Sequence, residues 1–399
     1  MMTEQAKVPE IRFAGFTDPW EQRKLGELTE SYSGGTPAAG ESEFYGGSIP
    51  FIRSAEIAAE STELFLTEKG YESSSARMVK PGDVLYALYG ATSGEVAVSR
   101  QKGAINQAIL AILPRDDCDA RYITAWLRKQ KGYIVTTYLQ GGQGNLSGVI
   151  VKNLEVSIPS LPEQQKIGFM LSHLDSLITL HQRKYDKLVV FKKSMLEKMF
   201  PKDGESVPEI RFAGFTDPWE QRKASEVFQI VDDRGHPTLP VLSATQNQGM
   251  IYRDDSGRYI GHDESNEIGY KRVLPGDFVV HLRSFQGGFA HSQYEGITSP
   301  AYTVFRAKEP TSHSDRFWKH WFMSEHFIAG LSTVTYGIRD GRSISVDEFM
   351  NTFLAFPAVE EQAAISRLFD YLDDLITLHQ RKLELLQNIK KSLLDKMFA

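Results

Sequence analysis

The stretch LDSLITLHQRKYDKLVVFKKSMLEKMF, Leu174–Phe200, decides the architecture of this chain because it occurs twice. A near-copy, LDDLITLHQRKLELLQNIKKSLLDKMF, occupies Leu372–Phe398. The offset between the copies is 198 residues, which is close to half of the 399 residues in the chain. An internal repeat over such a distance indicates that the chain is built from duplicated structural units. We therefore expect two units that follow one plan.

Two further repeats flank the long one. The segment VPEIRFAGFTDPWEQRK at Val8–Lys24 recurs without change at Val207–Lys223, and we call each copy a lead-in. The motif P-x-x-x-E-Q-x-x-I begins at Pro159 and again at Pro357, just before each long repeat. Between these blocks, residues 25–158 and 224–356 share only landmarks such as PGDVL and PGDFV. Each half therefore has the order lead-in, variable head, long repeat.

This order predicts six segments: a lead-in at 1–24, a first head at 25–160, a central helix at 161–200, a linker with the second lead-in at 201–223, a second head at 224–358 and a C-terminal helix at 359–399. The heads consist mostly of short apolar runs bounded by Gly and Pro, which is typical of β-strands. Each head also contains a helix-like stretch, Ala120–Leu139 and Ser314–Tyr336. We expect an α+β fold with two mixed, β-rich heads joined by two long helices.

Apolar residues recur in steps of four and three along both long repeats, which is the seam of a coiled coil. The seam residues are Ile167, Leu171, Leu174, Ile178 and Leu188 in the first helix and Ile365, Phe369, Leu372, Ile376 and Leu386 in the second. A helix of about 36 residues is roughly 54 Å long. We expect the two helices to pair antiparallel with pseudo-twofold symmetry; the alternative is that each packs only on its own head.

His181 and His379 occupy matching positions on this seam. They can fix the register of the two helices as a polar pair, or they can bind a metal ion. A metal site needs more ligands than these two imidazoles. We therefore expect no metal site.

The composition is that of an ordinary globular protein, with 41% hydrophobic and 24% charged residues. A single cysteine, Cys118, excludes an intramolecular disulfide framework and suits a reducing cytoplasm. The N-terminus lacks the apolar run of a signal peptide, and no run approaches the roughly 18 apolar residues of a membrane span. We expect a cytoplasmic chain without membrane contact.

Motifs that carry chemistry are missing from the sequence. A Walker A loop, a G-x-G-x-x-G turn after a strand, an Asp/Asn-Pro-Pro-Tyr/Phe methyltransferase motif, H-E-x-x-H and G-x-S-x-G do not occur. We therefore expect a binding protein without catalytic residues and without a cofactor of its own.

The chain contains four features in the same order twice: the DPWEQRK lead-in, the head, the P-x-x-x-E-Q motif and the long helix. This arrangement resembles the specificity (S) subunit of type I restriction–modification systems. The resemblance covers essentially the whole chain. It implies that each head is a target recognition domain that reads one half of a split double-stranded DNA target. Half-sites about one helical turn apart, roughly 34–36 Å, lie on one face of the duplex.

The resemblance also implies partners. The long helices set the spacing between half-sites and dock two modification subunits, which bind S-adenosylmethionine and methylate adenine. Two restriction subunits add ATP-driven translocation and DNA cleavage. The cofactors S-adenosylmethionine, ATP and Mg are thus expected on the partner subunits.

Polar loops of the heads become candidate DNA contacts under this interpretation. They are Arg53, Ser54, Thr92, Ser93, Asn106, Gln107, Gln143 and Asn145 in the first head, and Ser243, Thr245, Gln246, Arg283, Ser284, Gln286, Arg339 and Arg342 in the second. Arg339 and Arg342 are the strongest, because paired arginines in a Gly-flanked loop suit guanine or phosphate. Alternatively, Arg53 and Arg283 form salt bridges, Asn106 and Gln107 cap strands, and the Gly-rich loops are plain turns.

The charge leaves a second function class open. The chain has a net charge of −6, and the heads have net charges of −3 (residues 25–158) and −4 (residues 224–356), whereas DNA-binding proteins are usually basic. Base contacts within a complex whose affinity comes from the partners would reconcile these values with DNA binding. The alternative is a two-headed scaffold that binds proteins or glycans, and a third is an enzyme with an unrecognised site.

Overall fold

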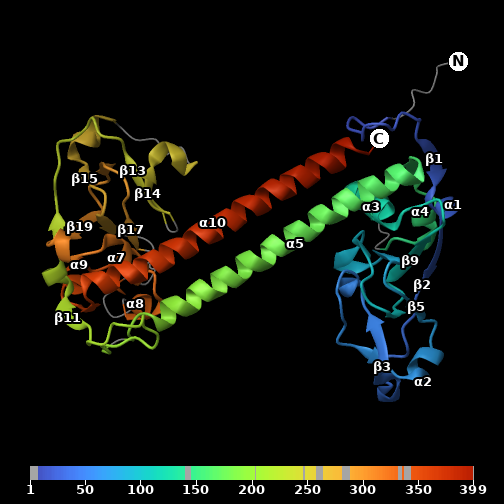
Figure 1. Ribbon diagram of the computed structural model, residues 1–399, viewed down its shortest axis with the longest axis horizontal. Helices are drawn as coiled ribbons and strands as arrows, with labels where there is room; N and C mark the ends of the chain where they lie inside the picture. Colours follow the sequence, from blue (N-terminus) through green and yellow to red (C-terminus); the bar gives the residue numbers. More distant parts are fainter. Residues whose placement is uncertain are drawn as a thin grey trace. The chain divides into compact units, whose positions relative to one another are not determined.

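The computed structural model describes residues 8–139, 145–202, 204–245, 248–257, 264–280, 288–330, 335–336 and 343–398. The chain divides into two compact units (Figure 1). Unit 1 comprises Met1–Gln182 and Arg381–Ala399, and unit 2 comprises Arg183–Gln380. The long helices α5 (Leu161–Lys198) and α10 (Val359–Lys396) each contribute one segment to each unit. The predicted α+β fold, with two β-rich heads and two long helices, is confirmed.

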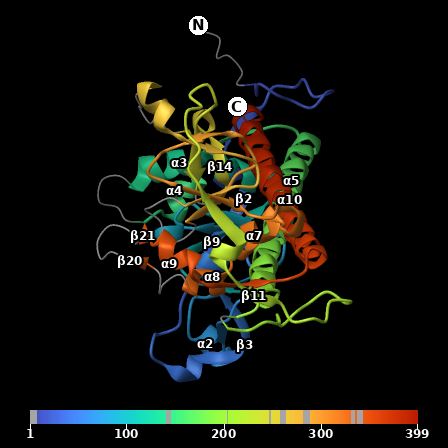
Figure 2. The ribbon, with the colours of Figure 1, turned by 90° about the vertical axis from the view of Figure 1, so that its left-hand side faces the viewer.

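The head of unit 1 is built on two four-stranded sheets. The first has the order β2 (Thr29–Ser33), β9 (Ile109–Pro114), β6 (Val84–Ala87) and β7 (Val96–Val98). The second has the order β4 (Phe65–Leu66), β3 (Tyr45–Ile52), β8 (Gly103–Ile105) and β5 (Arg77–Val79). All pairs are antiparallel except β3 with β8. Figure 2 shows β3 beside α2 (Glu68–Glu72) at one end of this head.

Apolar side chains from both sheets, among them Ile52, Leu85 and Ala111, form one core of unit 1. A second, larger core lies beneath α3 (Ala120–Leu139), whose Tyr122 and Trp126 are buried. The short helices α1 (Leu25–Leu28) and α4 (Gly148–Lys152) and the antiparallel pair of β1 (Glu21–Lys24) and β10 (Glu155–Ile158) surround this larger core.

Unit 2 repeats this plan with different residues. Its four-stranded sheet has the order β12 (Phe228–Val231), β19 (Thr303–Ala307), β16 (Phe278–Val280) and β17 (Phe289–His291). The smaller pairs are β13 (Leu242–Thr245) with β14 (Gly249–Tyr252), β15 (Lys271–Val273) with β18 (Gly296–Thr298), β11 (Glu220–Lys223) with β22 (Phe353–Phe356), and β20 (Thr335–Tyr336) with β21 (Ser343–Ile344). The short helices are α6 (Ala224–Val227), α7 (Asp315–Trp321), α8 (Glu325–Gly330) and α9 (Val346–Met350).

One predicted element is wrong. The sequence predicted a single helical stretch over Ser314–Tyr336, but the structure has α7, a turn, α8 and the short strand β20. The hydroxyl of Ser324 accepts a hydrogen bond from the backbone N–H of Phe327 at 3.3 Å. A serine that caps the first turn starts a new helix, so local capping interrupts the periodic pattern.

A buried ion pair fixes each lead-in to a long helix. The guanidinium of Arg12 binds the carboxylate of Glu163 through Nε at 2.7 Å and Nη2 at 2.8 Å, and Glu163 is 0% exposed. In unit 2, Arg211 binds Glu361 in the same way at 2.6 and 2.7 Å. We call these two pairs the Arg–Glu clamps. They explain why an arginine in each lead-in and a glutamate in each P-x-x-x-E-Q motif recur together.

The glutamine of the same motif holds the start of the helix. Gln164 donates through Nε2 to the carbonyl oxygens of Pro159 (2.9 Å) and Asp117 (3.1 Å), and its Oε1 accepts from the backbone N–H of Asp119 at 2.9 Å. Gln362 makes the equivalent bonds in unit 2. Each glutamine therefore ties the proline of its motif to the loop before the head's main helix.

The two long helices run antiparallel within each unit (Figure 1). In unit 1 the lead-in N–H of Ile11 binds the carbonyl of Lys396 at the end of α10, while Arg12 binds Glu163 at the start of α5. Asp175 of α5 also pairs with Lys390 of α10.

Unit 2 repeats these contacts. Ile210 binds Lys198 at the end of α5, and Lys192 pairs with Asp373 of α10 at 2.5 Å. Asp175 and Asp373 are equivalent positions of the repeat, as are Lys192 and Lys390, so the same cross-helix ion pair occurs in each unit.

The predicted seam residues line these helix pairs. Ile167, Leu171, Ile365, Phe369 and Leu372 are buried in the cores of their units. Leu174, Ile178, Leu188, Ile376 and Leu386 are half-buried.

We expect Arg12→Ala to lower the free energy of unfolding by about 3–5 kcal/mol, because it leaves the Glu163 carboxylate buried without its partner. Urea unfolding of the full chain measures this loss. Arg100→Ala, which removes a solvent-exposed pair with Glu60, is the control and should change stability little. A loss equal to that of the control would contradict a stabilising role for the clamp.

The core of unit 2 encloses a histidine among aromatic rings. The ring of His313 lies 5.2 Å from that of Phe228 and 6.0 Å from that of Trp318, centroid to centroid. Both ring nitrogens are shielded from solvent and have no hydrogen-bond partner. Burial lowers the pKa of His313 from 6.5 to about 4, an effect that Asp315 opposes and His291 reinforces.

Because the folded state holds His313 neutral while the unfolded chain protonates near its ordinary pKa, stability falls as pH drops from about 6.5 towards about 4. We expect His313 to contribute a loss of about 2 kcal/mol between pH 7 and pH 5. Burial lowers the pKa of His320 as well, in the same direction. Urea titrations at both pH values, on the native chain and on His313→Phe, measure the effect. An equal pH dependence in both proteins would refute it.

Candidate nucleic-acid interface

In unit 1, the polar side chains gather where two parallel strands end. β3 and β8 pair in parallel, with Ile52 opposite Ile105, so Arg53 and Asn106 leave the sheet at the same edge. β5 begins there too, because Arg77 pairs with Ile105 on the other side of β8. Carboxyl ends of parallel strands collect side chains from distant parts of a chain in this way. We call this the loop edge of unit 1.

Loops of the second sheet meet the same edge. Ser33 at the end of β2 pairs with Leu110, and Ala87 at the end of β6 pairs with Ile109 at the start of β9. The backbone N–H of Leu88 donates to Ala108 at 2.8 Å, and Leu88 accepts from the N–H of Leu146 at 3.0 Å. These bonds bring residues 34–36, 88–94, 106–108 and 145–146 to one edge.

The structure therefore places seven predicted contact residues at the loop edge of unit 1: Arg53, Ser54, Thr92, Ser93, Asn106, Gln107 and Asn145. The eighth, Gln143, lies outside the described residues. Arg53, Gln107 and Asn145 are exposed, whereas the others are half-buried.

Several of these side chains already have local partners. Asn106 accepts a hydrogen bond from the N–H of Ala108 through Oδ1 at 3.1 Å, as expected of a capping residue. Gln107 bonds to Thr36, and the hydroxyl of Ser93 donates to the carbonyl of Gly90 at 2.9 Å. The guanidinium of Arg53 binds Glu56. These contacts shape the loops and leave the exposed ends of the longer side chains available.

Arg77 is a loop-edge residue that the sequence did not single out. It is exposed, and its guanidinium lies 3.8 Å from the ring centroid of Tyr32. The hydroxyl of Tyr32 in turn donates to the carbonyl of Met78 at 2.8 Å. The position of Arg77 depends on pairing between β5 and β8, which no local pattern reveals.

Unit 2 has an equivalent loop edge. Val241 and Ile297 form a parallel bridge, and the hydroxyl of Thr298 at the end of β18 donates to the carbonyl of Leu242 at 3.3 Å. Lys271 pairs with Thr298, and Arg234 forms a bridge with Lys271. Arg234 and Lys271 therefore lie at this edge, and the sequence singled out neither.

Of the predicted contacts in unit 2, Ser243 follows Leu242 on β13 at the loop edge. Thr245 instead holds the hairpin turn: its hydroxyl donates to Gly249 at 2.8 Å and accepts from the N–H of Gln248 at 3.1 Å. The remaining six lie outside the described residues: Gln246, Arg283, Ser284, Gln286, Arg339 and Arg342.

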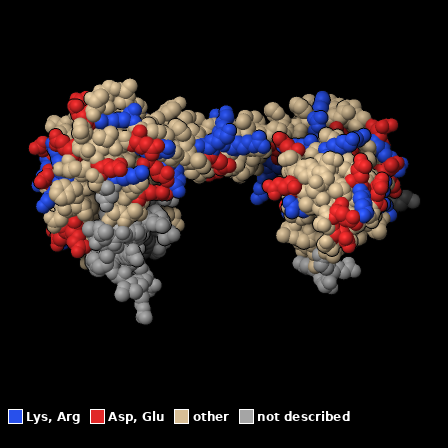
Figure 3. Space-filling model, turned by 90° about the horizontal axis from the view of Figure 1, so that it is seen from below, with Lys and Arg blue, Asp and Glu red and all other residues tan. Residues whose placement is uncertain are grey.

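Charge is distributed differently on the heads and on the helices. Figure 3 shows Lys and Arg side chains gathered along the helices, while both signs are mixed on each head. Residues 163–200, which include most of α5, have a net charge of +3, against −3 and −4 for the heads. Hydrogen bonds from arginine lower the pKa of Glu56 and of Asp232, so these loop-edge carboxylates are ionised at neutral pH.

One group of potential metal ligands occurs among the described residues: His320, Asp370 and Asp373. Basic side chains already form ion pairs with the two carboxylates. Lys319 lies 3.6 Å from Asp370 and 3.5 Å from Asp373, and Lys192 also binds Asp373. The group therefore forms an ionic network within unit 2, which does not suit a metal ion.

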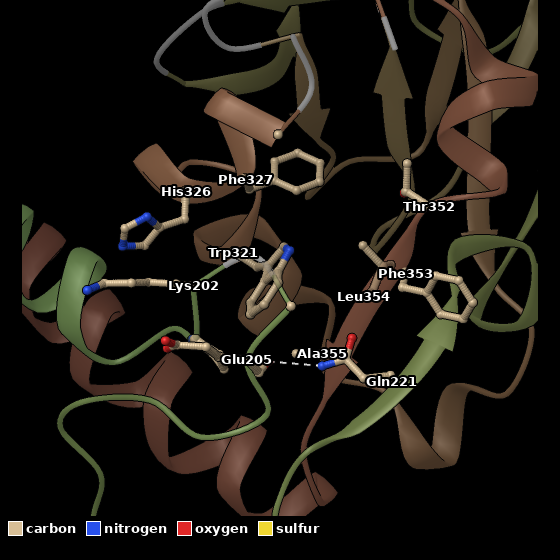
Figure 4. Close-up of a pocket in the computed structure, with 13 residues that line it drawn as sticks. Lys202, Glu205, Gln221, Trp321, His326, Phe327, Thr352, Phe353, Leu354 and Ala355 are labelled. Carbon is tan, nitrogen blue, oxygen red and sulfur yellow. Dashed lines mark hydrogen bonds between the residues drawn. The ribbon is translucent and has the colours of Figure 1, made fainter. Parts of the chain in front are cut away.

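A pocket of about 310 Å³ in unit 2 lies on the scaffold side of the head (Figure 4). Trp321, Phe327 and Leu354 line it, and the side-chain amide of Gln221 donates to the carbonyl of Glu205 at 3.0 Å along its rim. It lies beside the β11–β22 pair. This pocket is thus part of the lead-in attachment and is separate from the loop edge.

None of the helices among the described residues has the length and apolar character needed to cross a membrane.

Residues 17–189 match the family model of the type I restriction modification DNA specificity domain. The internal repeats carry the lead-in, the P-x-x-x-E-Q motif and the long helix into the second half. Over these residues, and through the repeated blocks of the second half, the chain is similar to specificity subunits of type I restriction–modification systems.

Relatives extend over nearly the whole chain. The specificity subunit of the type I restriction enzyme MjaVIII from Methanocaldococcus jannaschii is 22% identical over 398 residues, which cover 95% of this chain and 92% of the relative. The MjaIX specificity subunit of the same organism is 31% identical over 170 residues, or 40% of this chain and 38% of the relative. The crystal structure of the type I S subunit from M. genitalium has the same fold, with a TM-score of 0.59 at 13% identity over 98% of this chain and 99% of that chain.

Proposed function

We propose that this chain is the non-catalytic subunit that gives a type I restriction–modification complex its DNA sequence specificity in the cytoplasm. Each head reads one half of a bipartite duplex target through its loop edge. The observation that carries the proposal is the contrast between the two units: they share one scaffold, including both Arg–Glu clamps, but they present different side chains at equivalent edges.

The two loop edges suit different base sequences. Unit 1 presents Arg53, Arg77 and Gln107, whereas unit 2 presents Arg234; the half-buried Lys271 beside it donates to the carbonyl of Tyr302 at 2.8 Å. Arginine and lysine bind the guanine edge, and glutamine binds adenine, in the major groove. Two readers of different chemistry on equivalent scaffolds recognise an asymmetric target with two unlike half-sites.

The duplicated scaffold suits two copies of one partner. Each lead-in has the same sequence, and both expose the same apolar side chains: Val8 is 54% and Ile11 41% exposed in the first copy, and Val207 is 47% and Ile210 38% exposed in the second. Identical exposed surfaces bind identical partners. Two modification subunits, which bind S-adenosylmethionine and methylate adenine, dock here and along the helices; two restriction subunits that use ATP and Mg complete the nuclease.

Single-molecule methylome sequencing tests the reading role. A host receives the gene for this chain, the neighbouring methyltransferase gene, or both. We expect a new split adenine-methylation motif only when both genes are present, because neither protein alone supplies both recognition and chemistry. Without a new motif and without a complex between the two proteins, the two-headed scaffold that binds proteins or glycans becomes the better explanation.

The docking surface is tested with Val8→Asp and Val207→Asp, which place a charge in each exposed apolar patch. Each single variant should bind one modification subunit in place of two, and the double variant should bind none, as measured by native mass spectrometry. Val149→Asp is the control: Val149 is 68% exposed and lies in the first turn of α4, outside the repeated segments. A double variant that still binds two subunits would refute this surface.

A further inference from the structure

One arginine at the loop edge of unit 1 is held in place before any ligand arrives. The Nε of Arg53 donates to Oε2 of Glu56 at 3.1 Å, and Nη2 donates to Oε1 at 2.7 Å. Glu56 is itself fixed, because its Oε2 also accepts from the backbone N–H of Arg53 at 3.0 Å and from the hydroxyl of Thr62 at 3.1 Å. The Glu56 side chain is 15% exposed, while that of Arg53 is 51% exposed.

This geometry leaves one edge of the guanidinium free. A guanidinium has five N–H groups in a planar fork, and the side-on pair with Glu56 uses one on Nε and one on Nη2. No described residue accepts a hydrogen bond from Nη1. The outer N–H of Nη2 and an N–H of Nη1 therefore point away from the carboxylate, side by side, in the arrangement that matches O6 and N7 of guanine.

Glu56 also reduces the conformational entropy that Arg53 loses when it binds a base. A free arginine loses much rotamer freedom when it binds, and holding the side chain in advance removes part of that loss. The carboxylate also offsets the long-range attraction of the guanidinium for any phosphate. The pair therefore favours a directional contact over a general electrostatic one.

Unit 2 has a counterpart at its own loop edge. Arg234 donates to Asp232 through Nε at 2.7 Å and through Nη2 at 3.2 Å, and its side chain is 45% exposed. Arg53 follows β3, whereas Arg234 follows β12, which is the counterpart of β2. The duplication thus does not explain why both edges have such a pair.

We propose that Arg53 and Arg234 each read a guanine in the half-site of their own head, and that Glu56 and Asp232 are positioning residues that orient the two guanidinium groups. This inference rests on the proposed function and names specificity residues for it.

The experiment uses the full chain in complex with its modification subunit. Methylation rates are measured on duplexes that carry the native motif and on duplexes with each base pair of the motif changed in turn. In Arg53→Ala, the preference for guanine at one position of one half-site should fall about 10- to 100-fold. Glu56→Gln, which keeps the size of the side chain but loses the second acceptor oxygen, should relax that same position and no other. Arg234→Ala should relax one position in the other half-site.

Arg100→Ala is the matched control. Arg100 is also 51% exposed and also pairs with a glutamate, Glu60, but through a single contact at 3.2 Å, and it precedes the amino end of β8, whereas Arg53 follows the carboxyl end of β3. It should leave every base preference unchanged.

The outcomes distinguish a failure of the proposed function from a failure of the guanine assignment. If the native chain produces no methylated motif, the proposed function fails and this inference fails with it. If the native motif appears and Arg53→Ala slows methylation equally on all duplexes, Arg53 contacts phosphate and the inference alone is overturned. An unchanged preference in Glu56→Gln, with a relaxed position in Arg53→Ala, overturns the positioning role of Glu56.

Discussion

The fold depends on a carboxylate that water cannot reach. Glu163 and Glu361 are almost completely buried, and a buried charge is tolerated only when a partner of opposite charge binds it with good geometry. Arg12 and Arg211 supply that partner from the lead-ins, so each lead-in must lie against the start of a long helix. The next residue back along each lead-in binds the end of the other long helix. Each clamp thus joins three distant segments, and the strands β1 and β11 at the ends of the lead-ins are placed to pair with β10 and β22.

With the scaffold fixed in this way, the heads can diverge without losing their sheets. The landmarks PGDVL and PGDFV mark the same turn in both: Asp83 and Asp277 accept a hydrogen bond from the backbone N–H three residues earlier, at 2.9 and 2.7 Å. The intervening glycines, Gly82 and Gly276, have φ angles of 99° and 92°, which a side chain would disfavour. The turn sets the start of the central strand, β6 or β16, and the strand order follows. Most other head residues differ between the two halves.

This division explains what the sequence could and could not predict. The long helices and the seam follow from periodicity within short stretches of sequence. The duplicated plan follows from repeated motifs that the sequence shows directly. The loop edges depend on parallel pairing between β3 and β8, whose residues are more than fifty positions apart, so Arg77 and Arg234 carried no local signal. Loop composition did point to Arg53, Asn106 and Gln107, because glycine and polar residues gather where strands end. It also pointed to Thr245, which closes a hairpin, since the same residue types make turns.

The acidic heads are consistent with a reader whose selectivity exceeds its general affinity. Phosphate contacts attract any DNA sequence, and a strongly basic head would bind non-target DNA almost as well as its target. At the loop edges, Arg53 and Arg234 are each neutralised by a carboxylate, which removes much of their long-range attraction but keeps two directed N–H groups. In the proposed function, affinity comes from α5, whose residues 163–200 have a net charge of +3, and from partner subunits. In the proposed function, base preference comes from short, directional contacts at the loop edges. A subunit that varies its heads while keeping its scaffold needs this separation, because a change of loop then alters the target without altering how tightly the complex holds DNA.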